Sequence, residues 1–274
     1  MGEKTKISWV RNSDGTQGHT FNPVWGCAKV GPGCDHCYAE RFSNRFGDFW
    51  GVGKPRREFD DKHWDEPLKW NRAAEKAGIR IRVFCASMAD AFDKDWPGGT
   101  RDRLWNLIKA TPHLDWIIVT KRIGNAAKML PADWGDGYDN VWLIITIVTQ
   151  DEADRDIPKL LATPAKVRGL SIEPQLEHID ISNWLFGREE PCCDCGWQGR
   201  HTLDGEAGLH WVISGAESGN GRRPYNMNWA RALRDQCHAA DVSFFLKQTP
   251  GGTGPKGVIE TPELDGHTWE QLPG

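Results

Sequence analysis

The chain has 274 residues, a formal net charge of −4 and 39% hydrophobic residues. This length suits one large domain or two small ones, and the composition is typical of a soluble globular protein. No apolar run reaches about 18 residues, which excludes a transmembrane helix, and the N-terminal MGEKTKISW lacks the apolar core of a signal peptide. We therefore expect a cytoplasmic protein without a membrane partner, and the slightly acidic charge argues against a globally basic surface.

The chain is rich in two residue types that suggest function. Eight cysteines without an export signal indicate metal ligands in a reducing compartment rather than disulfides. The 15 tryptophans have two interpretations: they pack the core, or they form platforms on which nucleobases stack.

The most informative segment is residues 21–40, FNPVWGCAKVGPGCDHCYAE, with Cys27, Cys34 and Cys37 in the spacing C-x6-C-x2-C. Three thiolates leave one iron of a 4Fe–4S cluster without a protein ligand, whereas electron-transfer clusters have four. Glycine and proline allow the loop to turn tightly around a bulky cluster. A helix that begins at Tyr38 would direct its first amides at the anionic cluster. A structural zinc site with a distant fourth ligand and unliganded thiols are the alternatives.

The rest of the chain alternates between apolar runs and helical patterns. We predict a short strand at 6–10, helices at 38–46 and 65–77, and a solvated basic group at 54–57 (KPRR). The apolar runs predict strands at 81–88, 116–120, 141–148, 167–172, 209–214 and 242–246. Helical patterns occupy 100–110, 125–130, 151–161 and 229–240.

These runs are continuous rather than alternating, which indicates strands buried on both faces. Strands that alternate with helices predict a parallel sheet with right-handed crossovers. The pattern favours one α/β domain over residues 1–274, a (β/α) barrel that is complete or incomplete. A doubly wound open sheet is the alternative.

Polar residues follow most of the predicted strands, at the edge where parallel α/β folds bind ligands. Carboxylates there would hold an ammonium group or ribose hydroxyls, and cations would hold a carboxylate. Each residue also has a purely structural interpretation, such as a helix cap or a solvated loop. The candidates are Ser87, Asp90, Lys121, Arg122, Glu173, Glu217, Ser218, Arg222 and Lys247.

A second cysteine group, CCDCGWQGRH at 192–201, lies in a polar insertion at about 185–208. Cys192 and Cys195 form a metal knuckle, and Cys193 and His201 are candidates to complete a zinc site, with His210 as a further possibility. A redox pair or no metal at all are the alternatives. The two remaining cysteines, Cys85 and Cys237, are expected in the core.

The cysteine loop beside such a pocket resembles the radical S-adenosylmethionine (SAM) enzymes, although their usual first gap has three residues and this one has six. More closely, the chain resembles a phage-associated family of radical-SAM-like iron–sulfur proteins of unknown function, often encoded beside three-Cys-motif partner proteins. The matching segments are the cysteine loop, SMADAFD, DWIIVTKR, LSIEP, WVISGAESG with the following RRP, and FFLKQ. A more distant resemblance is to spore photoproduct lyase, which repairs thymine dimers in DNA.

The closer resemblance implies a radical-SAM-type TIM barrel with a 4Fe–4S cluster on Cys27, Cys34 and Cys37. It also implies SAM as cofactor, an electron donor, and a three-Cys-motif protein as partner. The resulting expectation is an enzyme that modifies or repairs DNA, another nucleic acid or a nucleotide through a 5′-deoxyadenosyl radical. A non-catalytic iron–sulfur module that binds DNA or senses redox state is the alternative.

Roles for individual residues follow from that resemblance and from position along the strands. Ser87 and Asp90 would hold the cofactor ammonium, and Glu173 or Glu217 its ribose. Its carboxylate would bind Lys121, Arg122 or Arg222. A proton or hydrogen atom would come from Lys247 or Tyr38.

Overall fold

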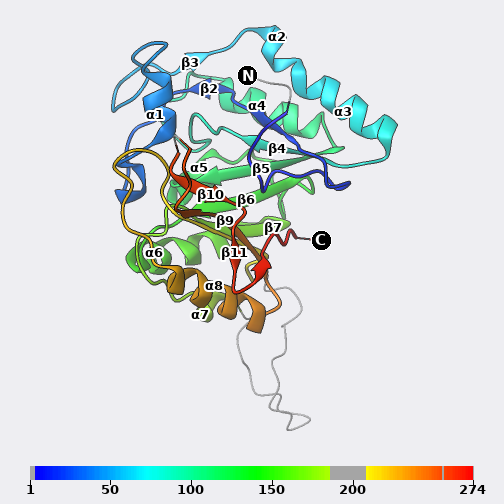
Figure 1. Ribbon diagram of the computed structural model, residues 1–274. Coiled ribbons are helices and arrows are strands. Elements are labelled where there is room, and N and C mark those ends of the chain that lie inside the picture. The colour runs from blue at the N-terminus through cyan, green and yellow to red at the C-terminus, as the bar shows by residue number, and fades with distance from the viewer. Residues whose placement is uncertain (1–3, 186–207, 255, 274) are drawn as a thin grey trace.

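The computed structural model describes residues 4–185, 208–254 and 256–273 (Figure 1). The main sheet contains β1 (His19–Phe21), β4 (Ile81–Cys85), β5 (Leu114–Thr120), β6 (Val141–Thr146), β7 (Val167–Ile172), β8 (Trp211–Gly215), β9 (Ser243–Pro250) and β10 (Val258–Glu260). Two ribbons pair β2 (Val24–Trp25) with β3 (Arg57–Glu58) and β11 (Glu263–Leu264) with β12 (His267–Thr268). The helices are α1 (Tyr38–Ser43), α2 (Asp61–Trp64), α3 (Glu66–Ala77), α4 (Thr100–Lys109), α5 (Ala126–Met129), α6 (Gln150–Leu161), α7 (Ser182–Leu185) and α8 (Met227–Ala239), with 3-10 turns η1 (Pro32–Cys34) and η2 (Ile123–Asn125).

The eight strands of the main sheet follow one another in space in the order β1-β4-β5-β6-β7-β8-β9-β10. All neighbours from β1 to β9 are parallel, and β10 is antiparallel to β9. A doubly wound sheet would reverse its strand order at a switch point, and this sheet does not. The outer strands β1 and β10 do not pair with each other, so the chain forms a curled, open half-barrel. The predicted (β/α) barrel is therefore confirmed in its incomplete form.

The predicted strands and helices from residue 65 onward all exist, with ends that shift by a few residues. The predicted strand at 6–10 is wrong, because this segment turns back on itself. Its turn is closed by backbone hydrogen bonds from Asn12 to Thr16 and from Gly18 to Val10. The strand that precedes the cysteine loop is β1, which pairs in parallel with β4.

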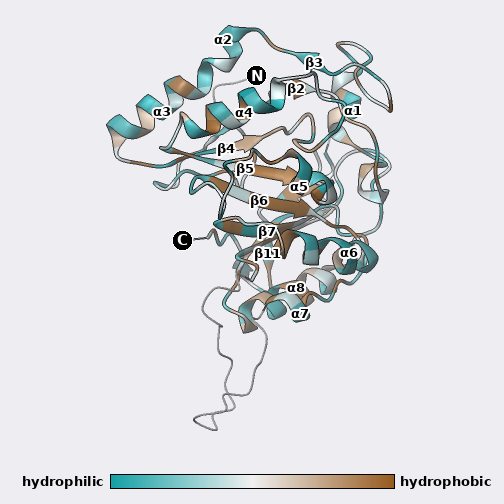
Figure 2. Ribbon diagram, turned by 180° about the vertical axis from the view of Figure 1, so that it is seen from behind, coloured by the Kyte–Doolittle hydropathy of each residue, from teal (hydrophilic) through white to brown (hydrophobic). Residues whose placement is uncertain are grey.

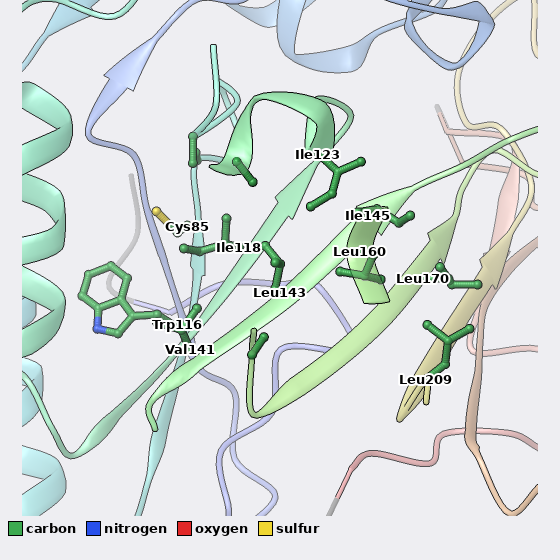
Figure 3. Packing of buried hydrophobic residues seen from close by; sticks show 14 of the residues in the cluster. Cys85, Trp116, Ile118, Ile123, Val141, Leu143, Ile145, Leu160, Leu170 and Leu209 are labelled. Atoms are coloured by element: carbon green, nitrogen blue, oxygen red, sulfur yellow. The ribbon is translucent and has the colours of Figure 1, made fainter. Parts of the chain in front are cut away.

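Side chains of successive strand residues point to opposite faces of the sheet and build two cores. On one face, residues such as Cys85, Ile118 and Leu143 pack beneath the helices (Figure 3). On the other face, Trp142 and Trp211 belong to a smaller cluster covered by the N-terminal segment around Trp9 and Val10. Figure 2 shows the resulting pattern of apolar strands and more polar helices.

Most of the tryptophans serve packing. Nine of them are at most 7% exposed: Trp9, Trp25, Trp64, Trp96, Trp105, Trp116, Trp134, Trp142 and Trp211. The interpretation of tryptophan as a platform for nucleobases is therefore wrong for these nine.

The basic group at 54–57 is only partly solvated, contrary to the prediction. The Arg56 side chain is 0% exposed and forms an ion pair with Asp93, 2.8 Å from Nη2 to Oδ2. It also donates hydrogen bonds to the carbonyls of Phe49, Gly51 and Lys54. Arg56 thus links the loop after α1, at Phe49 and Gly51, to Asp93 in the segment that follows β4.

No helix in the part of the chain that the structure describes has both the length and the apolar character needed to cross a membrane.

Candidate functional site

The cysteine loop leaves β1 at the carboxyl edge of the parallel sheet and stays there. Ala86, directly after β4, donates a backbone hydrogen bond to Phe21, and Gly26 donates one to Met88. Gly26 has a φ of 117°, and a Cβ at this position would lie 2.2 Å from the Phe49 carbonyl oxygen. Only glycine fits there, so the backbone conformation at Gly26 fixes the position of the next residue, Cys27.

Cys27 lies against the loop that follows β5. The Arg122 Nη1 atom donates a hydrogen bond to the Cys27 sulfur over 3.2 Å, and Nη2 donates one to the Ala28 carbonyl over 2.7 Å. Burial, together with the Asp90 charge, raises the pKa of the Cys27 thiol to about 12, although Arg122 opposes this rise. A thiol in such surroundings ionises when a metal compensates the charge.

Asp90 orients this arginine. One of its carboxylate oxygens accepts hydrogen bonds from Thr120 and Phe92, and the other from the Lys121 amide and Arg122. Both oxygens are therefore occupied by the protein. The predicted role of Asp90 as a ligand for the cofactor ammonium would require these bonds to be exchanged.

Cys34 and Cys37 lie at the other end of the loop, next to Lys121. A Cβ at Gly33 would be 3.3 Å from Lys121 Cε. Burial raises the pKa of the Cys37 thiol, the Cys34 charge adds to this rise, and Lys121 and the first amides of α1 oppose it. Because Lys121 and Arg122 are consecutive, they bring Cys34, Cys37 and Cys27 to the same part of the edge.

The residues present fit a 4Fe–4S cluster in donor type and in charge. Three thiols and two cations suit an anionic cluster, in which each thiolate binds a different iron. Within the described ranges, no three His, Cys, Asp or Glu side chains are grouped so that they could bind one metal ion. The other described thiols are buried in the core: Cys85, which Figure 3 shows, and Cys237. Thus no fourth described thiol reaches the loop.

Glu217, after β8, holds the middle of the cysteine loop. It accepts a hydrogen bond from the His36 ring over 2.8 Å, and its Oε1 lies 2.6 Å from Arg223 Nη2. Arg223 in turn donates to the Pro32 carbonyl over 2.9 Å. Burial tends to raise the Glu217 pKa, but the bonds from Arg223 and His36 outweigh it and leave the pKa lowered.

His36 and Arg223 are residues that the sequence analysis missed. His36 lies between two predicted ligands, which is the signal that could have identified it. Arg222 was the predicted residue, but it is exposed and lies against Gly257 in the turn between β9 and β10. The neighbouring Arg223 contacts the cysteine loop instead. Ser218, next to Glu217, is half-buried.

Glu173 and Lys247 form an ion pair that spans β8 on the inner face of the sheet. The residue between them is Gly215, where a Cβ would lie 3.5 Å from Glu173 Cγ and 3.6 Å from Lys247 Cβ. A larger side chain would come between the two charged groups. Glu173 also helps to raise the pKa of the nearby Tyr225 to about 12, an effect to which burial contributes most.

Tyr38, the first residue of α1, links the end of the cysteine loop to the segment that follows β4. The residue is 57% exposed, yet its hydroxyl donates a hydrogen bond to the Ser87 carbonyl over 2.9 Å. Burial of the hydroxyl and the charges of Cys37 and Glu173 raise its pKa, so the phenol stays protonated at neutral pH. The Ser87 hydroxyl itself is engaged with Asn22. The structure therefore gathers most of the predicted site residues along one edge.

The predicted zinc site cannot be placed, and a separate hollow lies away from this edge. Cys192, Cys193, Cys195 and His201, the predicted zinc ligands, lie outside the described residues, as does most of the predicted insertion. A hollow of about 430 Å³ adjoins the outer side of the loop at Val30–Pro32 and the start of α6, and none of the predicted cofactor residues line it.

The fold and this edge define a class of protein: an open β/α half-barrel with a three-cysteine loop over the carboxyl ends of its parallel strands. The chain belongs to the family DUF5131, described as a protein of unknown function, whose model matches residues 4–273. The comparison with curated proteins finds no match.

Two solved structures of spore photoproduct lyase are distantly similar to this chain. One, complexed with dinucleoside spore photoproduct, has 15% sequence identity and a TM-score of 0.46, and the match covers 86% of this chain and 66% of the lyase. The other, a mutant with bound AdoMet and dinucleoside spore photoproduct, has 14% identity and a TM-score of 0.44, with coverages of 88% and 68%. The chain thus spans just under two thirds of the first lyase chain.

Proposed function

We propose that this protein is a radical-SAM-type iron–sulfur enzyme that modifies or repairs nucleic acid or a nucleotide. The observation that carries the proposal is the three-cysteine loop at the carboxyl edge, with the Arg122 guanidinium 3.2 Å from the Cys27 sulfur. Cys27, Cys34 and Cys37 would hold a 4Fe–4S cluster and leave one iron open. Such a cluster, when bound, supplies the electron that cleaves SAM to a 5′-deoxyadenosyl radical.

The protein's own residues would position the reactants. Arg122, held by Asp90, stabilises negative charge on Cys27, and Lys121 does the same for Cys37. Glu217, through His36 and Arg223, fixes the backbone between the cysteines. We assign Asp90 and Glu217 to positioning rather than to direct contact with SAM, because the protein already occupies their oxygens.

The inner edge of the sheet would face the substrate. Lys247, in its ion pair with Glu173, and Tyr38, whose pKa is raised, would each carry a hydrogen that could be transferred. Glu173, half-buried and paired with Lys247, would accept a hydrogen bond from a ribose hydroxyl. Ser218 and Arg222 remain candidates for outer contacts.

The test is electron paramagnetic resonance of anaerobically purified, dithionite-reduced protein, with and without SAM. We expect a 4Fe–4S signal that shifts on addition of SAM, and 5′-deoxyadenosine as a product. A cluster signal that ignores SAM would overturn the enzymatic proposal in favour of a non-catalytic iron–sulfur module. A colourless protein without iron would overturn both.

Replacing Arg122 with methionine should lower the midpoint potential of the cluster by on the order of 50 mV. The reduced cluster carries more negative charge, and the variant removes both a positive charge and a charge-assisted hydrogen bond from its Cys27 ligand. The potential is measured by a redox titration followed by electron paramagnetic resonance. Arg72→Met, on the exposed side of α3, is the matched control and should leave the potential unchanged. An unchanged potential in an Arg122→Met protein with full iron content would contradict the role given to Arg122.

A further inference from the structure

Helix α1 begins directly after Cys37 (Figure 1), and the helix and the turn that follows it carry exposed aromatic rings and arginines. Phe42 is 37% exposed and Phe46 is 54% exposed, and adjacent exposed apolar side chains, unlike isolated ones, mark interaction sites. Arg41 and Arg45 are also exposed on this segment. We call this surface, together with Arg57, the α1 surface.

Contacts with the Trp25 ring hold the rings of Phe42 and Phe46 in place. The Trp25 ring, only 6% exposed as a residue, meets Phe42 at 5.7 Å and Phe46 at 5.6 Å between centroids, in both cases edge to face. The two phenylalanine rings are themselves 5.1 Å apart and inclined by 50°. Such packing fixes the rings while part of each remains open to solvent, so little side-chain entropy is lost when a flat ligand binds.

The charges around the rings favour an anionic ligand. Asp48 is paired with Lys54, and Glu40 lies 3.7 Å from Lys29. The Arg45 guanidinium, by contrast, has no hydrogen-bond or ion-pair partner among the residues that the structure describes, and only the Arg45 backbone amide is engaged, with the Phe42 carbonyl. The Arg57 guanidinium lies 5.0 Å from the Trp25 ring centroid, where it continues the aromatic layer with positive charge.

We propose that the α1 surface binds single-stranded nucleic acid. Bases would stack on Phe42 and Phe46, and Arg45 and Arg57 would contact phosphates, whereas Arg41 donates a hydrogen bond to the His36 carbonyl over 3.4 Å. Aromatic faces interleaved with guanidinium groups are the arrangement that single-strand binding uses. This binding site deepens the proposed function and rests on it, because α1 connects the α1 surface directly to Cys37, a proposed cluster ligand.

The experiment measures fluorescence anisotropy of a labelled single-stranded oligonucleotide, as DNA and as RNA, with full-length protein purified anaerobically. We expect saturable binding that weakens with salt, and weaker competition by the same sequence as a duplex, whose bases are stacked internally. Phe42→Leu/Phe46→Leu should bind at least tenfold more weakly, because leucine keeps the apolar contact but removes the ring face. Phe42→Tyr/Phe46→Tyr is the matched control and should bind nearly as well as the wild type.

The arginines give a second, independent readout. Arg45→Gln should reduce the slope of log affinity against log salt by about 0.7, the contribution of one phosphate contact on a single strand. Arg72→Gln, on exposed α3, should leave that slope unchanged. Binding that ignores both the leucine and the glutamine substitutions, or no binding by the wild type, would overturn the proposal.

Failure of this inference can be told apart from failure of the proposed function. Preparations used for anisotropy are also examined for the SAM-dependent cluster signal. A protein that responds to SAM but binds no oligonucleotide keeps its proposed chemistry and loses the α1 surface as a binding site. A protein that binds single strands through Phe42 and Phe46 without a cluster signal supports the surface and refutes the radical chemistry.

Discussion

Replacing Cys34 with alanine is expected to abolish the brown chromophore of anaerobically purified protein. Two remaining thiolates, Cys27 and Cys37, would have to hold a cluster that needs three, and metal binding to so few ligands is weak. The fall should be close to complete both in visible absorption and in iron bound per chain. The SAM-dependent resonance signal should disappear with it.

The matched control is Cys237→Ala, which also removes one thiol. Cys237 is fully buried in α8, and burial raises its pKa to about 12, so it stays protonated and packs as an apolar side chain. This variant should keep its colour and lose only a little stability. Full iron content in Cys34→Ala would refute the ligand assignment, whatever the control shows.

The second large effect is on stability. Arg56→Ala should lower the free energy of unfolding by about 3–5 kcal/mol, the cost of breaking a buried ion pair from one side. The Asp93 side chain, 2% exposed, would lose its guanidinium partner. Asp95 would lose its ion pair as well, 3.2 Å from Nη2 in the wild type. Urea denaturation, followed by circular dichroism, measures the change.

Arg72→Ala serves as the control for this prediction, because an exposed arginine on α3 should contribute less than about 0.5 kcal/mol. Arg56→Lys should recover only part of the loss, since an ammonium group cannot reproduce the planar set of donors that Arg56 uses. Equal stabilities of Arg56→Ala and Arg72→Ala would show that the buried pair stabilises nothing.

The order of elements could be predicted because it depends on local patterns. The run 141–148 is apolar at every position except Thr146, and such a continuous run is typical of a strand buried on both faces. Gly78 ends α3 in the left-handed conformation, as the sequence predicts for a glycine after a helical pattern. The cysteine spacing likewise marked the loop, since ligand types close in sequence need no long-range information.

The contacts at the site depend on which strands become neighbours, and this only the tertiary structure decided. Glu173 and Lys247 are 74 positions apart, and they meet because β8 lies between β7 and β9 with a glycine at the crossing point. Arg223 rather than Arg222 reaches the loop because of where the chain turns after β8. Arg56 looked like part of a solvated basic group because charge in a sequence does not reveal burial. The sequence by itself determined the main strands and helices from residue 65 onward and the cysteine loop through short-range pattern, whereas pairing between distant side chains followed from packing, which no local pattern records.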